Sequence, residues 1–127
     1  GCQFTASDGE VKFARYFPTG TATQGGGDVT AYIYDDPNIV YAIQSAGSAD
    51  FADIGQLADH VAGTGDTSTG QSKFEISGTT GTGTAGMRIL GLYETPKNAF
   101  GTNGILEATI HEHELNQHID ADGTVGV

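Results

Sequence analysis

Glycine limits what this chain can fold into more than any other residue, because 20 of its 127 residues are Gly. Each Gly inside a helix costs about 1 kcal/mol relative to Ala, so a chain this rich in Gly does not build long helices. Many of the glycines alternate with Thr and Ser, as in residues 63–70 and 78–86, which is typical of turns and loops. The sequence therefore predicts an all-β protein with long Gly/Thr-rich loops and little helix.

The segments between these loops are short and rich in β-branched and aromatic residues, which favours strands. We expect strands at residues 11–17, 29–34, 39–44, 72–77, 87–93 and 105–114. Short strands separated by turn signals at this spacing indicate an antiparallel β-sandwich or a barrel-like domain.

Two local patterns are the clearest. Residues 29–34 and 39–44 flank the turn formers Asp35-Asp36-Pro37-Asn38, so the sequence predicts that they pair as a hairpin. Residues 105–114 alternate, with Leu106, Ala108 and Ile110 on one face and polar residues on the other.

Residues 48–62 leave two possibilities open. Apolar residues recur there at helical spacing, and Ser48 or Asp50 stands where a helix cap is needed. Gly55 interrupts that pattern, and a short strand that ends at Val61 fits equally well. The segment is either a helical turn or an irregular crossover.

The length of the chain corresponds to one compact domain, so we expect a single β domain over residues 1–127. The chain opens on a strand-like run without an initiator Met, from which we expect it to be the C-terminal part of a longer chain. Its net charge of −11 argues against binding the phosphates of nucleic acid and against attraction to an anionic membrane. Its apolar runs are too short to span a bilayer, and the single Cys2 cannot form an internal disulfide.

The run His111-Glu112-His113-Glu114 is the most suggestive motif for chemistry, because His111 and His113 project on the same side of a strand. Together with His118 and Glu107, these imidazoles could ligate zinc or another transition metal. The spacing differs from the helical zinc-protease motif, in which two His residues lie four positions apart. We therefore favour a polar strand face, at the solvent or at an interface, and predict no metal site.

Four further patterns suggest chemistry, and each has a structural explanation. Asp120-Ala121-Asp122-Gly123 resembles the opening of a calcium loop but lacks the closing Glu. The neighbouring carboxylates of Asp35 and Asp36 are explained by their turn. The run Gly25-Gly26-Gly27 does not lead from a strand into a helix, as a phosphate-binding loop does. Cys2 lies in an apolar run and fits a place in the core.

The aromatic residues could form a sugar-stacking face, although cross-strand packing is the simpler role for them. The residues concerned are Tyr16, Phe17, Tyr32, Tyr34 and Tyr41. Because no group of residues forms a catalytic constellation, we predict that the protein is not an enzyme and has no catalytic, cofactor-binding or metal-binding residues.

Three groups of residues resemble segments of structural proteins from the virions of tailed phages, many of them marine. The first is Tyr32-Ile33-Tyr34-Asp35-Asp36-Pro37-Asn38-Ile39-Val40-Tyr41-Ala42-Ile43-Gln44. The second is Ala52-Asp53-Ile54-Gly55 with residues 61–70, and the third is residues 87–92 with Pro96, Asn98, Ile110 and His113. The matches run in order from about residue 28 to residue 114, and consist of turn and strand residues, so they indicate a related fold more than an activity. In the proteins it resembles, these segments lie in the C-terminal part of longer chains.

The resemblance implies a virion protein on the capsid surface, of the decoration or cement type, that binds the major capsid protein as a homotrimer. It brings no catalytic residues and no cofactor. His111 and His113 would then lie near a subunit interface, where their protonation would couple assembly to pH. The alternative is a glycan-binding or host-adhesion module on a head fibre or tail, marked by exposed aromatic side chains at Tyr32, Tyr34 or Tyr93. A metal-dependent hydrolase is a third possibility and requires zinc at His111, His113 and His118.

Overall fold

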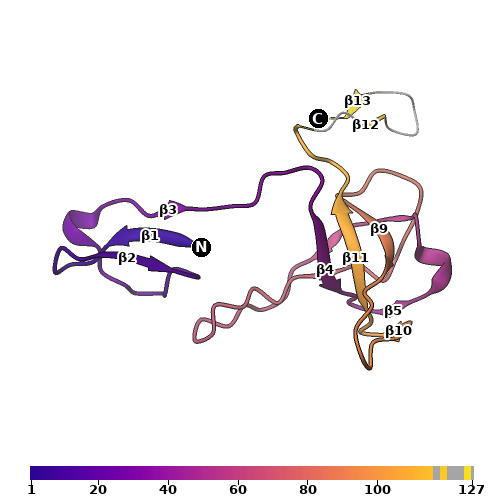
Figure 1. Cartoon of the computed structure of the whole chain (residues 1–127), viewed down its shortest axis with the longest axis horizontal. Helices are drawn as coiled ribbons and strands as arrows, with labels where there is room; N and C mark the ends of the chain where they lie inside the picture. The colour runs from indigo at the N-terminus through magenta and orange to yellow at the C-terminus, as the bar shows by residue number, and fades with distance from the viewer. Residues whose placement is uncertain (116–117, 120–124, 127) are drawn as a thin grey trace. The chain divides into compact units, whose positions relative to one another are not determined.

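The structure is a computed structural model that describes residues 1–115, 118–119 and 125–126. Its strands are β1 (Cys2–Thr5), β2 (Val11–Ala14), β3 (Thr30–Ala31), β4 (Val40–Gln44), β5 (Ser48–Ala49), β6 (Leu57–Ala58), β7 (His60–Val61), β8 (Glu75–Ile76), β9 (Met87–Leu92), β10 (Gly101–Thr102), β11 (Ile105–Ile110), β12 (His118–Ile119) and β13 (Val125–Gly126). Two short 3-10 helices, η1 (Gln24–Gly26) and η2 (Phe51–Asp53), complete the elements of the described chain (Figure 1). The predicted all-β, antiparallel, sandwich-like class with little helix is confirmed.

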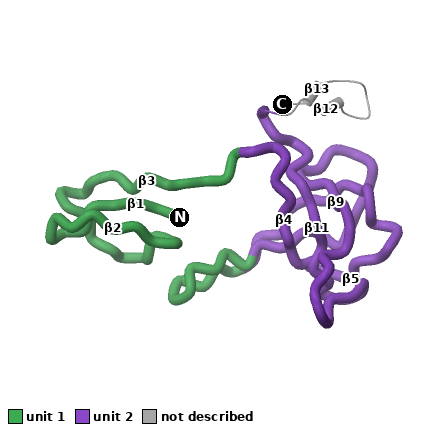
Figure 2. The backbone as a smooth tube through the Cα atoms, in the orientation of Figure 1, with its two compact units in different colours: residues 1–35, 64–73 green, residues 36–63, 74–127 purple. Residues whose placement is uncertain are grey.

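The contacts within the chain divide it into two compact units (Figure 2). Unit 1 comprises Gly1–Asp35 and Thr64–Lys73, and unit 2 comprises Asp36–Gly63 and Phe74–Val127. The expectation of one domain over residues 1–127 stays a prediction. Charge is distributed unevenly: unit 1 has a formal net charge of −2, and the remaining −9 of the chain's −11 belongs to unit 2.

Unit 2 is built on a four-stranded antiparallel sheet in the order β4-β11-β9-β6. The register places Leu106 opposite Ile43 and Leu92, and Ala108 opposite Tyr41 and Ile89, so these side chains share one face. Leu106, Ala108 and Ile89 are almost completely buried on that face. The predicted alternation of Leu106, Ala108 and Ile110 is therefore confirmed, but β11 ends at Ile110, so the predicted strand over residues 105–114 is too long. The strand expected at residues 87–93 is present as β9.

A second layer covers this sheet. Ile76 of β8 is fully buried and Ala49 of β5 is nearly so, and both belong to the same apolar cluster as the sheet residues. The segment that the sequence left open, residues 48–62, forms β5, η2, β6 and β7. Asp50 caps η2: its carboxylate accepts the Ala52 amide at 3.1 Å, while the Asp53 carboxylate accepts the Asp50 amide at 2.6 Å.

Asn98 closes the long loop between β9 and β11. Its Nδ2 donates to the carbonyl of Tyr93 at 2.7 Å and to that of Ile105 at 2.8 Å, and its Oδ1 accepts the Ile105 amide at 2.9 Å. Because one side chain bonds to three backbone groups, and two of these bonds are partly buried, the loop is held to the two main strands at a single position.

Replacing Asn98 with Ala should lower the free energy of unfolding by about 1–3 kcal/mol, since it removes the acceptor of the partly buried Ile105 amide. Asn98→Asp is the matched control, because it keeps the acceptor and loses both donated bonds. We expect its effect to lie between wild type and Asn98→Ala in thermal or denaturant unfolding at neutral pH. Equal stability of wild type and Asn98→Ala would contradict this role.

Unit 1 contains a smaller three-stranded sheet in the order β2-β1-β3. Only Cys2, Phe4 and Ala6 are buried in its cluster, with Ala14 packed against them. The ring of Phe17 meets Phe4 edge to face, with centroids 5.1 Å apart. Cys2 therefore lies in the core, as predicted.

The predicted hairpin between residues 29–34 and 39–44 is wrong. Strand β3 pairs with β1 and strand β4 pairs with β11. The turn itself is present, because Asp36 Oδ1 accepts the Asn38 amide at 2.8 Å and the Asp36 carbonyl accepts the Ile39 amide. Residues 32–34 do not belong to a strand, although their composition favours one.

Candidate binding surface

The loop at residues 66–71, closed by an antiparallel bridge between Asp66 and Gln71, packs on the end of β2 in unit 1. We call this loop the hairpin tip. Arg15 Nη2 donates to the carbonyl of Thr69 at 2.7 Å, and the Tyr16 hydroxyl donates to the carbonyl of Ser68 at 2.9 Å. Gly70 approaches the Tyr16 ring so closely that a Cβ at residue 70 would lie 2.1 Å from it. Two side chains that follow β2 thus hold a loop more than 50 residues further along the chain.

Asp66 organises this tip. Its Oδ1 accepts the Ser68 hydroxyl at 2.6 Å, the Ser68 amide at 2.9 Å and the Thr69 amide at 3.3 Å. Its backbone accepts the Gly70 amide and donates to the Gln71 carbonyl, both at 2.8 Å. The hydrogen bond from the Ser68 hydroxyl, followed by the backbone amides, lowers the pKa of the Asp66 carboxyl.

The lowered pKa predicts how the tip responds to acid. A carboxyl whose pKa is lower in the folded state stabilises that state above its unfolded pKa, near 3.8, and loses the contribution as pH falls through the folded value. We expect an NMR titration of Asp66 to give a midpoint below 3.8 and the Ser68 and Thr69 amide signals to shift with it. In Asp66→Asn those amide shifts should disappear. A midpoint at or above 3.8 would contradict this arrangement.

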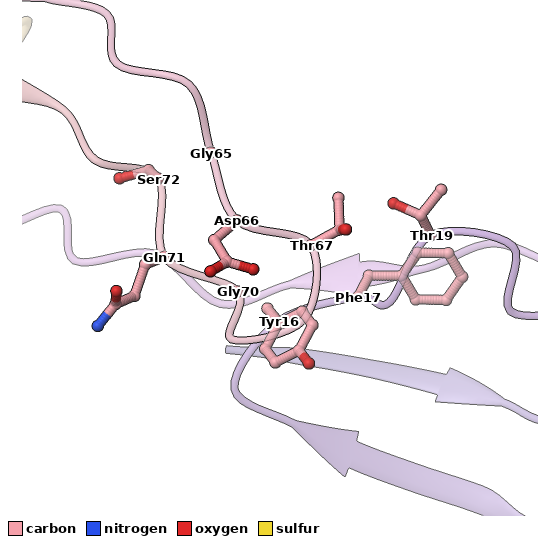
Figure 3. A pocket seen from close by; sticks show the side chains of 9 residues that line it. All are labelled: Tyr16, Phe17, Thr19, Gly65, Asp66, Thr67, Gly70, Gln71 and Ser72. Carbon is pink, nitrogen blue, oxygen red and sulfur yellow. The ribbon is translucent and has the colours of Figure 1, made fainter.

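A shallow hollow of about 280 Å³ lies between the hairpin tip and the segment after β2 (Figure 3). It is lined by Tyr16, Phe17, Thr19, Gly65, Asp66, Thr67, Gly70, Gln71 and Ser72. The lining combines two aromatic rings with hydroxyl, amide and carboxylate groups. Such a surface can hold a polar ligand or a protein side chain by stacking and hydrogen bonding.

One face of the unit 1 sheet carries exposed apolar side chains. The register places Phe13 opposite Gln3 and Val11 opposite Thr5, and the Tyr32 hydroxyl donates to Gln3 Oε1. Phe13 is 72% exposed, and Val11 and Tyr32 are each 52% exposed. We call this surface, formed by Gln3, Thr5, Val11, Phe13, Thr30 and Tyr32, the open face; it contains no charged residue.

The histidines of the suggested metal motif follow β11. His113 is buried, so the expectation of a polar face at the solvent or an interface is wrong for this residue. Its Nδ1 accepts the Leu115 amide at 3.1 Å, which occupies the atom that a metal would need on that side. Among the residues that the structure describes, no group of three or more His, Cys, Asp or Glu could hold a metal ion. The calcium-like run at residues 120–123 lies outside the described residues.

The suggested aromatic face is divided between the units. Tyr16, Phe17, Tyr32 and Tyr34 belong to unit 1, whereas Tyr41 packs against the core of unit 2. Tyr34 is 82% exposed, and Tyr93 in unit 2 is 39% exposed.

The hollow beside Asp66 does not follow from the sequence pattern, because residues 63–70 indicate only a polar loop. Two local signals pointed to it: an Asp followed two residues later by a Ser, which favours a side-chain-stabilised turn, and a Gly at the end of that turn. The partner residues Arg15 and Tyr16 carried no signal.

No helix in the described part of the chain is long and apolar enough to cross a membrane. The chain matches none of the family models, curated proteins or solved structures with which it was compared.

Proposed function

We propose that the protein is a structural component of a tailed-phage virion that decorates the capsid and stabilises neighbouring subunits of the major capsid protein. It acts without catalysis and without a cofactor, and assembles as a homotrimer on the capsid surface. The resemblance of residues 28–114 to virion structural proteins supports this proposal directly.

The exposed apolar side chains of unit 1 are the structural observation that supports this proposal. Phe13, Ile33 and Tyr34 of unit 1 are between 72% and 82% exposed, while the core of this unit consists of three buried residues and one neighbour. A small domain with so little buried apolar area gains stability from a partner that covers its surface. The open face, which is apolar at its centre and uncharged, is the contact that such a partner would cover.

The stabilising mechanism is burial repeated over many copies. Covering one exposed Phe or Ile side chain contributes about 1.5–3 kcal/mol. Each copy that bridges two capsid subunits adds such a contribution to the same shell, so that modest energies per copy sum over the particle. The net charge of −11 keeps the unbound chain soluble at the concentration that assembly needs.

The proposal can be tested by adding the purified protein to virus particles that lack it. We expect the chain to bind to saturation and to raise the temperature at which the shell opens and releases its DNA. Phe13→Lys should weaken binding, and Phe51→Lys is the matched control because it places the same charge at a similarly exposed Phe of unit 2. Particles that open at the same temperature with and without bound chain would contradict a stabilising role.

A glycan-binding or host-adhesion module is the second candidate, and the exposure of Tyr32 and Tyr34 favours it. Tyr32 and Tyr34 are both exposed and lie two residues apart, and residues at this spacing in extended backbone project to the same side, where they could stack on a sugar. A glycan array probed with wild type and Tyr34→Ala decides between the candidates. Specific signals that Tyr34→Ala abolishes would favour the adhesion role.

A further inference from the structure

Strand β3 has a free edge whose direction follows from its pairing with β1. Gly1 and Tyr32 exchange both backbone hydrogen bonds, at 2.8 and 3.2 Å, so the backbone groups of Tyr32 face β1. In an antiparallel pair these groups alternate, and those of Ala31 and Ile33 therefore point away from β1. In the described chain β3 has no other neighbouring strand, and no hydrogen bond reaches the backbone of Ile33 or Tyr34.

Strand β4 has a matching free edge at Val40 and Ala42. Beyond Gln44 this edge is covered by β8, because Ser45 forms a parallel bridge with Ile76 and Ala46 donates to the Ile76 carbonyl at 2.8 Å. Ser45 donates to the carbonyl of Gly104 at 2.9 Å, so the odd-numbered residues of β4 face β11. The backbone groups of Val40 and Ala42 therefore point away from the sheet. Strand β4 is the terminal strand of its four-stranded sheet, and both residues are exposed.

Apart from the short length of β3, neither edge carries the features that usually protect a free strand. Natural proteins blunt exposed edges with Lys, Pro or bulges. Residues 29–34 and 40–44 contain no charged residue, no Pro and no Gly. Ile33 and Tyr34, at 80% and 82%, are the most exposed large hydrophobic residues in the part of the chain that the structure describes.

We propose that these two edges pair with each other between copies of the chain, with β3 and residues 32–34 of one copy adding antiparallel to β4 of the next. Placing Ala31 opposite Ala42 and Ile33 opposite Val40 satisfies the outward backbone groups of all four residues. The same register places Tyr32 beside Tyr41, a favourable cross-strand pair. A contact between β3 and β4 covers both kinds of edge at once. If β3 paired with β3 and β4 with β4, two different contacts would be needed.

The distribution of charge supports a contact between unlike units. Three of the five basic residues, Lys12, Arg15 and Lys73, belong to unit 1, and unit 2 carries a net charge of −9. Pairing β4 with β4 of another copy would bring two units of net charge −9 together, while pairing it with β3 brings that unit to one of net charge −2, with less repulsion. The contact is head to tail, so it generates a ring or an open chain of copies.

Proline substitution tests each edge separately. Ile33→Pro and Ala42→Pro each remove an outward N–H that the isolated chain does not use, and Pro is tolerated at such edge positions. We expect wild type to self-associate in analytical ultracentrifugation, and each variant to weaken association at least tenfold, which corresponds to about 1.4 kcal/mol. Circular dichroism and Cys2 burial check that each variant is folded, and Phe51→Lys serves as an exposed-surface control.

A mixture of the two variants is the decisive experiment. Ile33→Pro keeps a working β4 edge and Ala42→Pro keeps a working β3 edge, so the mixture should form a dimer although each variant alone is monomeric. Hydrogen exchange of the Ala31 and Ile33 amides should slow as the concentration of wild type rises. A monomeric wild type, a mixture that does not associate, or protection of these amides that does not depend on concentration would each overturn the proposal.

Discussion

Replacing Gly70 with Ala should detach the hairpin tip from the end of β2 and lower the stability of unit 1 by about 2–4 kcal/mol. Two effects combine at this position. Gly70 has a φ of +69°, which an L side chain adopts only with strain, and its added Cβ would lie 2.1 Å from the Tyr16 ring. Neither the backbone nor the ring can keep its place, so the hydrogen bonds that Arg15 and Tyr16 donate to the tip should be lost.

Amide exchange and the ring signals of Tyr16 measure this effect. We expect fast exchange of residue 70, whose amide donates to the Asp66 carbonyl, and a shift of the Tyr16 ring protons toward values of an exposed tyrosine. Gly83→Ala is the matched control, because a Cβ there meets no atom within 4 Å. If Gly70→Ala and Gly83→Ala behaved alike, the packing of the tip on Tyr16 would be refuted.

Replacing Ile76 with Ala should lower the free energy of unfolding of unit 2 by about 2–5 kcal/mol. Ile76 is 0% exposed and belongs to the apolar cluster that joins the second layer to the four-stranded sheet. Its backbone also accepts the Ala46 amide at 2.8 Å, which ties β8 to the end of β4. Because this position is held from two sides, the cavity left by Ala cannot collapse easily.

Ile76→Val provides the graded comparison, since removing one methyl group from a core costs about 0.5–1.5 kcal/mol. Denaturant unfolding of the three proteins should order them as wild type, then Ile76→Val, then Ile76→Ala. If Ile76→Ala lowered the free energy of unfolding by less than Ile76→Val does, Ile76 would not occupy the core.

The strands that the sequence predicted best are those with a clear apolar pattern. Residues 105–110 alternate so that one face is buried, and this pattern alone indicates that the strand covers a core. Residues 87–92 were predictable as a strand from their short, mostly apolar composition. The cap at Asp50 was similarly visible, because capping depends on residues that are close in sequence.

The pairing of strands was not predictable in the same way. Residues 29–34 and 39–44 have the composition of strands and flank a true turn, yet each uses one edge for a strand elsewhere in the chain. A local pattern specifies that a segment is extended, but it does not specify which partner its edge selects. The predicted hairpin pairs residues 29–34 with residues 39–44 of the same chain. The proposed contact pairs the same two segments, but between different copies.

The candidate surface depended on contacts between distant segments. The loop at residues 63–70 was recognisable as polar, but its place beside Tyr16 arises from hydrogen bonds between residues separated by 52 and 54 positions. His113 shows the same limit, because it lies beyond the end of β11 and its burial does not follow from the alternation that leads to it.

The number of copies of this chain per particle, measured against the major capsid protein by quantitative mass spectrometry of purified virions, tests the proposed decoration role. A decoration protein occupies repeated positions on the capsid lattice, so we predict a ratio near one or a fixed simple fraction of it. Only a handful of copies per particle would contradict a cement role and assign the chain to the neck, tail or a fibre.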